Sequence, residues 1–202
     1  MFCPAPSQTV FKETVITKIT AFHENELRRK AVNNEHMKYF NVNLSGLRVK
    51  PYPCLTGIVT AEEGKKLRPN VKFLSGDYLT YQKQLDQTSQ GSPLCRLCYQ
   101  EGETISHIVA RCSAYVKRTT FLEEIEAICS TSVNFDKSEI FSNGSPEIIT
   151  QFILDPTSFN LTKRVNISDP IAQQLFKISR DMCNYLHTER MRQLNELSKR
   201  RN

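Results

Sequence analysis

Four side chains that bind soft metals fall within one short stretch of the chain. The segment CRLCYQEGETISHIVARC, residues 95–112, contains Cys95, Cys98, His107 and Cys112 in the spacing C-x2-C-x8-H-x4-C. Zn²⁺ prefers thiolate sulfur and imidazole nitrogen, and three cysteines with one histidine make a standard closed site. The C-x2-C pair suits a tight turn that directs both thiolates at one metal. The pattern predicts a structural zinc site, because four protein ligands leave no open position for catalysis.

A competing interpretation is that these residues are ordinary core cysteines and a hydrogen-bonded histidine. Free cysteine is often buried in proteins. The clustering favours the metal, because the only cysteines between Cys54 and Cys129 are these three, and one of the chain's four histidines lies among them. Cys3, Cys54, Cys129 and Cys183 are isolated, and we expect them in the core or at the surface.

The predicted ligands need a particular local structure to meet at one metal. Gly102 is expected to reverse the chain after the C-x2-C pair, and residues 104–111 are expected to form helical turns that present His107. On a continuous α-helix, His107 and Cys112 would point about 140° apart. The helix must therefore end or loosen before Cys112, and Ser113 is a plausible cap for the next helix.

Apolar residues at helical spacing predict a mostly α protein, a helical bundle with an inserted Cys3His zinc knuckle. Ser7, Ser113, Ser145 and Ser168 are candidate N-caps, and Pro146 follows Ser145 at a typical first helical position. The expected helices cover residues 1–32, a segment from 61 interrupted near Pro69 and resumed over 71–85, and residues 114–129, 146–154 and 169–195. Gly and Pro residues predict a loop or connector over 41–60.

These elements suggest three regions along the chain. Residues 1–60 hold the N-terminal helix and connector, residues 61–130 hold basic helices with the knuckle at 95–112, and residues 131–202 form a C-terminal helical region.

Composition and charge bound the class of protein. Of the 202 residues, 39% are apolar, including 11 Phe and 7 Tyr, which is typical of a globular chain with a buried core. No run of 18 apolar residues is present, so we expect no membrane partner. The N-terminus lacks the pattern of a signal peptide, so the seven cysteines indicate a reducing compartment, the nucleus or the cytoplasm.

The region around the knuckle resembles a known family. The runs LRPNVKFLSGDYLTYQKQL, SPLCRLC and GETISHIVARC are similar to the zinc-binding region C-terminal to the reverse transcriptase domain of non-LTR retrotransposon proteins. That family shows a basic helix with a K-x-L-x-G-x-Y run, followed by C-x2-C, ET-x-x-H and a final Cys. The matching residues are Lys72, Leu74, Gly76, Tyr78, Cys95, Cys98, Glu103, Thr104, His107 and Cys112.

The resemblance implies a region that handles nucleic acid beside a polymerase and helps to grip template RNA or target DNA. A reverse transcriptase domain is then a further expected partner. No YxDD-like carboxylate motif, endonuclease domain, phosphate-binding glycine loop or nucleophile–base pair is recognisable, so we expect no enzyme activity in this chain. The chain resembles a C-terminal piece of a larger element protein, truncated or split from its enzyme.

Basic and aromatic residues near the knuckle favour nucleic-acid binding. The chain carries a net charge of +6, and residues 44–83 hold seven cations against three acids. Phosphate contacts dominate the affinity of most nucleic-acid-binding proteins, and exposed tyrosines can stack on bases. The candidate residues are Lys65, Lys66, Arg68, Lys72, Tyr78, Tyr81, Arg111, Lys117 and Arg118. For any single one of them, a solvated helix face or a core tyrosine is the more ordinary explanation, whereas the patch as a whole favours binding because its charge lies beside the knuckle.

A second function fits the same features. The knuckle and helices could form a scaffold that docks onto a polymerase domain or a host protein. The apolar stripes of residues 8–32 and 169–195 would then be partly exposed in the isolated chain.

Overall fold

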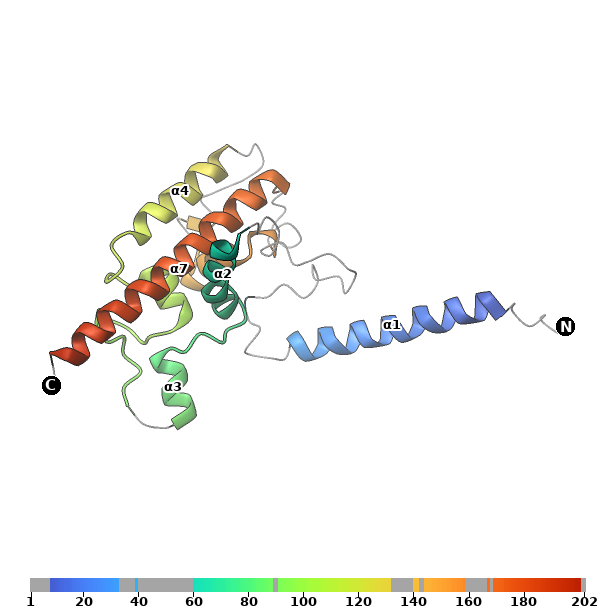
Figure 1. Ribbon diagram of the computed structural model, residues 1–202, viewed down its shortest axis with the longest axis horizontal. Helices are drawn as coiled ribbons and strands as arrows, with labels where there is room; N and C mark the ends of the chain where they lie inside the picture. The colour runs from blue at the N-terminus through green and yellow to red at the C-terminus, as the bar shows by residue number, and fades with distance from the viewer. Residues whose placement is uncertain are drawn as a thin grey trace.

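The computed structural model describes residues 8–32, 39, 60–88, 91–131, 140–141, 144–158, 167 and 169–200, and these are mostly helical (Figure 1). Across these ranges the only extended pairing is a single antiparallel bridge between Leu94 and Gly102. The predicted fold class is confirmed. The elements are α1 (Gln8–Val32), α2 (Ala61–Leu74), α3 (Tyr81–Thr88), η3 (His107–Arg111), α4 (Arg118–Ser130), α5 (Pro146–Leu154), η5 (Pro156–Ser158) and α7 (Asp169–Lys199).

The C-terminal helix α7 is the centre of the packed body. It contacts α2, α4 and α5, and Figure 1 shows it running between α2 and α4. Its apolar stripe faces inward, with Leu175, Phe176, Met182 and Leu186 all buried. The stripe predicted over 169–195 is therefore core, and residues of the 61–130 and 131–202 regions share that core. The predicted caps Ser7 and Ser168, and nearly all of the 41–60 connector, lie outside the described residues.

Helix α2 runs straight through the proline that was expected to interrupt it. Its start is a capping box, in which Thr60 accepts from the Glu63 amide and the Glu63 carboxylate accepts from the Thr60 amide. Pro69 lies inside the helix and is buried together with Phe73 and Leu74. An internal proline costs roughly 3 kcal/mol because it removes one backbone hydrogen bond. Burial against α7 offsets that cost, and the predicted interruption is wrong.

The helix ends instead at Leu74, where helical spacing predicted that it would continue. Gly76 adopts a left-handed conformation with φ 73°, which an L side chain rarely takes. The Tyr78 amide then donates to the Lys72 carbonyl at 3.0 Å and closes the end of the helix. A new helix, α3, begins at Tyr81, with the Thr80 hydroxyl accepting from the Lys83 amide.

The predicted start is correct for α5 and wrong for α4. Ser145 caps α5 through the Ile148 amide and Pro146 occupies its first turn, as predicted. Ser113 does not cap α4, because that helix begins five residues later at Arg118. The Ser113 hydroxyl donates to Gln100 at 3.3 Å instead. The apolar stripe predicted for α4 is confirmed, with Ile125 and Cys129 buried.

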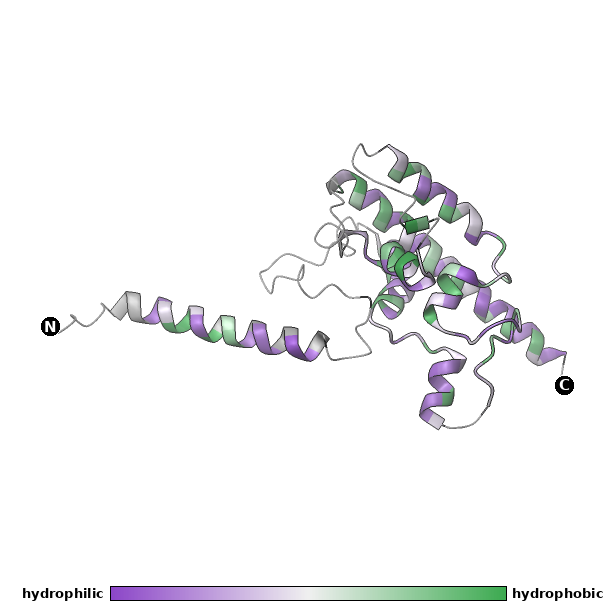
Figure 2. Ribbon diagram, turned by 180° about the vertical axis from the view of Figure 1, so that it is seen from behind, coloured by the Kyte–Doolittle hydropathy of each residue, from purple (hydrophilic) through white to green (hydrophobic). Residues whose placement is uncertain are grey.

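Helix α1 projects away from the packed body in both ribbon views (Figures 1 and 2). Figure 2 shows its apolar residues in the middle of the helix and hydrophilic residues toward the end nearer the body. Ile16, Ile19 and Phe22 are 64%, 52% and 67% exposed. Among the described helices, none has the length and the apolar character needed to cross a membrane.

Candidate metal centre

The four predicted ligands converge on one point. The ligand atoms of Cys95, Cys98, His107 and Cys112 all lie within 4.8 Å of one another. The Cys95 and Cys112 sulfurs are 3.8 Å apart, and the Cys98 sulfur is 3.3 Å from His107 Nε2. Around a tetrahedral Zn²⁺, neighbouring ligand atoms are roughly 3.8 Å apart for two sulfurs and 3.6 Å for sulfur and nitrogen. The arrangement could hold a metal ion, and its donor set is compatible with zinc.

The first two cysteines lie on a short turn closed by backbone hydrogen bonds. The Cys95 amide donates to the Glu101 carbonyl at 2.9 Å, and the Tyr99 amide donates to the Cys95 carbonyl at 2.8 Å. Tyr99 takes the left-handed conformation, with φ 58°, and turns the chain. Gly102 was predicted to make this reversal, but it lies in the bridge with Leu94 and is not among the left-handed glycines of the described chain.

A π-helical turn brings His107 and Cys112 together. The Cys112 amide donates to the His107 carbonyl at 2.7 Å, five residues back, and η3 spans His107–Arg111. In a π-turn the i→i+5 bond makes residues five apart about one turn apart. The loosening predicted before Cys112 is thus confirmed, and it takes the form of a wider turn. Cys112 then leaves the helical region with ψ 118°.

Polar side chains fix the turn that carries His107. The Thr104 hydroxyl accepts from the His107 amide at 3.1 Å, which satisfies one of the free donors at the start of the turn. The buried Ser106 hydroxyl lies 3.0 Å from Thr104 Oγ1 and donates to Glu147 of α5 at 3.1 Å. The turn is therefore tied to α5 through Glu147.

An acidic residue orients the histidine ring. His107 Nδ1 lies 3.4 Å from Glu101 Oε2, while Nε2 faces Cys98. A carboxylate that accepts from one ring nitrogen fixes the tautomer and leaves the other nitrogen free to bind a metal. The second Glu101 oxygen lies 3.5 Å from Arg111 Nη1. Glu101 therefore links the histidine to an exposed cation.

A buried ion pair joins the knuckle to α7. Arg190 Nη2 donates to Glu103 Oε1 at 2.6 Å, and both side chains are almost fully buried. The same oxygen accepts from the Tyr81 amide at 3.0 Å at the start of α3. Burial raises the pKa of Glu103, and the Arg190 guanidinium opposes that rise.

A second thiol and a buried cation lie beside the thiolates. The hydrogen bond from Cys112 is the largest cause lowering the pKa of Cys95, so Cys95 is the more acidic thiol of the pair. A Zn²⁺ ion with three thiolates and a neutral imidazole would carry a charge of about −1. Arg118 lies close enough to Cys112 to interact with its charge, and burial lowers the pKa of Arg118. Its guanidinium is thus placed to offset the charge of the site.

The residues predicted to bind nucleic acid divide into two groups. Tyr78 is 4% exposed and stacks on Phe73 with ring centroids 3.9 Å apart, so it is a core residue and cannot stack on a base. Nε and Nη1 of Arg118 are buried, which turns this side chain inward. Tyr81 is half-buried, whereas most of the predicted cations are exposed, namely Lys65, Arg68, Lys72, Arg111 and Lys117.

Three of the exposed cations form a stripe along α2. Lys65, Arg68 and Lys72 are spaced i, i+3 and i+7, which places them on one face of the helix. Lys66 lies off this stripe and pairs with Asp181 of α7 at 3.1 Å. The pKa of His187 in α7 is lowered first by burial and then by the charges of Lys72, Arg190 and Arg68. Two residues of the stripe, Lys72 and Arg68, therefore lie close enough to His187 to act on its charge.

Sequence reasoning missed three residues around the knuckle. They are Glu101 beside His107, Arg190 paired with Glu103, and Arg96 against the Tyr81 ring. Glu101 stands between two predicted ligands, and a ligand histidine often donates its second ring N–H to a carboxylate, so this nearby acid is a signal that could have identified it. Arg190 is separated from Glu103 by 87 positions, and nothing local in the sequence indicates such a partner.

Comparisons with known proteins add no relative. No protein-family model, curated protein or solved structure matches this chain.

Proposed function

We propose that this chain is a zinc-stabilised module that binds nucleic acid. The observation that carries the proposal is the cluster of four ligand atoms within 4.8 Å of one another. Three thiolates and one imidazole fill a tetrahedral zinc site, so the metal would be structural. It would hold the turn at Cys95–Cys98 against η3 and fix the surfaces on either side of the knuckle.

Exposed positive charge supports the nucleic-acid part of the proposal. The α2 stripe of Lys65, Arg68 and Lys72 pairs with no carboxylate within the described ranges. A stripe of unpaired cations suits a phosphate backbone. Arg111, the last residue of η3, and Lys117 beyond it are exposed and add charge next to the knuckle, although Arg111 also lies 3.5 Å from Glu101.

The test is salt-dependent binding to labelled single- and double-stranded oligonucleotides. We expect log affinity to fall linearly with log salt. Lys65→Ala with Arg68→Ala and Lys72→Ala should reduce that slope by about 0.7–0.9 for each phosphate that the variant no longer neutralises. The control variant is Lys12→Ala with Lys18→Ala and Lys30→Ala, because it removes the same net charge from α1 instead of from the stripe. Absence of binding at low salt by the metal-loaded chain would contradict the proposal.

The resemblance to the region C-terminal to non-LTR reverse transcriptases is part of the same proposal. Two residues of its motif make structural contacts here. Glu103 anchors the knuckle to Arg190, and Thr104 accepts from the amide of His107 at the start of its turn. A reverse transcriptase reading frame immediately upstream in the genome would support the relationship. An unrelated upstream frame would count against it.

One observation favours a second function, docking onto a protein. Ile16, Ile19 and Phe22 of α1 are each more than half exposed, and α1 projects from the body (Figure 1). Clustered exposed apolar residues often mark a protein interface. If Ile16→Ser with Phe22→Ser abolishes self-association or capture of a polymerase domain while nucleic acid is not bound, docking is the better account.

A further inference from the structure

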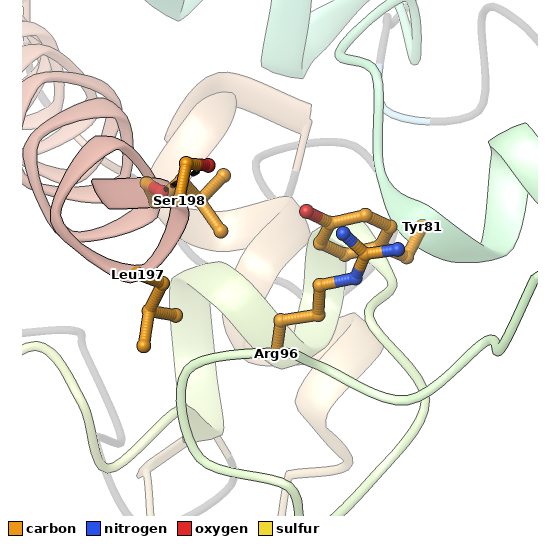
Figure 3. Close-up of a pocket in the computed structure, with 5 residues that line it drawn as sticks. Tyr81, Arg96, Leu197 and Ser198 are labelled. Carbon is orange, nitrogen blue, oxygen red and sulfur yellow. Dashed lines mark hydrogen bonds between the residues drawn. The ribbon is translucent and has the colours of Figure 1, made fainter. Parts of the chain in front are cut away.

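A small pocket lies between the knuckle, the start of α3 and the end of α7. Its lining residues are Tyr81, Arg96, Leu194, Leu197 and Ser198. Figure 3 shows the Arg96 guanidinium against the ring of Tyr81, with Leu197 and Ser198 of α7 across the opening. The cavity volume is about 50 Å³, and the hollow is partly open to solvent. That is far below the range of roughly 300–1,000 Å³ for ligand pockets, so the hollow admits only the edge of a small planar group and no large cofactor.

The pocket combines a stacking surface with positive charge. Arg96 Cζ lies 4.3 Å from the centroid of the Tyr81 ring, and Arg190 Cζ lies 5.5 Å from the same centroid. Arg190 is committed to Glu103, whereas Arg96 is exposed and has no acidic partner in the described part of the chain. The Arg96 side chain is thus held by the aromatic ring while its charge stays available.

The remaining walls suit the edge of a base. Leu194 and Leu197 supply an apolar side, and the Ser198 hydroxyl lies at the rim. That hydroxyl donates to the Leu194 carbonyl at 3.0 Å, so its lone pairs remain able to accept a hydrogen bond. Proteins that bind single strands stack unpaired bases on aromatic rings and on arginine planes, with cations nearby for phosphate.

We propose that this pocket receives the edge of one unpaired base of a single-stranded nucleic acid, with the base stacked against the exposed guanidinium of the Arg96–Tyr81 pair. The inference rests on the proposed function and makes it more specific. A base inside a duplex is already stacked on both faces, so the pocket favours single strands over duplexes. Arg96 then meets the phosphate next to the bound base.

The experiment compares two labelled strands of equal length and charge, one of ordinary nucleotides and one of abasic sugar-phosphate units. The native, metal-loaded chain should bind the ordinary strand about tenfold more tightly or better, from the usual effect of one stacked base. Arg96→Ala and Tyr81→Leu should each weaken binding of the ordinary strand toward that of the abasic strand. Lys177→Ala, which removes one exposed charge elsewhere on α7, should weaken both strands equally and only slightly.

Controls separate the possible failures. Tyr81→Phe should retain the preference for the ordinary strand, and metal content and thermal unfolding show whether Tyr81→Leu is folded. Equal binding of both strands by the native chain overturns the pocket assignment and leaves the proposed function standing. Binding of neither strand overturns both. If a free mononucleotide competes at the same concentration as an unlabelled strand, the ligand is a free nucleotide, and the inference is overturned.

Discussion

Arg190 Nη2 lies 2.6 Å from Glu103 Oε1, and this contact joins two parts of the chain that are 87 positions apart. The same Glu103 oxygen accepts from the Tyr81 amide, so the knuckle, α3 and α7 meet at one buried carboxylate. Glu103 also lies four residues before the ligand His107. This ion pair therefore helps to fix the position of the metal site relative to α7.

Breaking the pair should destabilise the fold substantially. Glu103→Gln leaves the buried Arg190 guanidinium without a counter-charge, and removing one partner of a buried pair costs about 3–5 kcal/mol. Chemical denaturation measured at neutral pH checks this value. Glu189→Gln is the matched control, because its partner Arg192 is half-exposed and an exposed pair contributes less than about 1 kcal/mol.

A double substitution tests whether the coupling is direct. Glu103→Leu with Arg190→Met removes both charges and should cost clearly less than the sum of the two single substitutions. Additive effects would show that the two side chains stabilise the fold independently.

Glu101 should control metal affinity with little effect on the fold. It is placed to accept from His107 Nδ1 at 3.4 Å and is itself half-exposed. Loss of such an outer partner typically reduces metal affinity about 10–100-fold. Competition with a chromophoric chelator measures the change for Glu101→Ala. Glu123→Ala, an exposed acid on α4, is the control, and equal affinities of the two variants would remove Glu101 from the site.

His187 should make the fold less stable in mild acid. Burial and the nearby charges of Lys72, Arg190 and Arg68 lower its pKa below the unfolded value. The unfolded chain then binds the proton more readily, so stability is fully present above about pH 6.5 and falls as the pH drops toward the folded pKa. His187 also meets the Tyr78 hydroxyl at 3.1 Å through Nδ1.

The measurement is the difference in unfolding free energy between the native chain and His187→Asn across pH 5–8. The native chain should lose stability relative to the variant as the pH falls. Using a difference cancels the metal release that acid causes in both proteins. A difference that does not change with pH would show that His187 is protonated equally easily in the folded and unfolded chains.

Metal removal should loosen the knuckle and the elements fastened to it. Without a metal, three thiols and a histidine remain at a point where Cys95 and Cys112 are fully buried. Hydrogen exchange should accelerate over 91–118 after treatment with a chelator, because metal binding and local folding are coupled. The α2–α7 contact should keep its protection, since Phe73 of α2 and Leu186 of α7 belong to the same buried core. Unchanged exchange at the knuckle would indicate a fold that needs no metal.

Much of this structure follows from local sequence patterns. Ligand spacing identified all four clustered residues, because three cysteines and a histidine at such close spacing are typical of a metal site. The apolar stripes of α4 and α7 and the Ser145–Pro146 start were predictable, since periodicity and caps are local signals. The geometric argument about His107 and Cys112 also predicted that an ordinary helix could not join them.

Several of the errors concern effects that arise from tertiary packing. Pro69 stays helical because α2 is buried against α7, and the partner helix lies about 100 residues away along the chain. Tyr78 was a candidate for stacking on bases, with a core position as the alternative, because a tyrosine side chain fits either place. The left-handed turn at Gly76 sends it back onto Phe73. The long-range pairs of Glu103 and Lys66 left no local trace either.

The central claim is that Cys95, Cys98, His107 and Cys112 hold one structural zinc ion. X-ray absorption at the zinc edge, on protein purified without added metal, tests it most directly. The account predicts one zinc per chain with three sulfur neighbours at about 2.3 Å and one nitrogen at about 2.0 Å, and loss of that metal in Cys95→Ser with Cys112→Ser. A chain without metal, or a double variant that keeps its full zinc content, would contradict it.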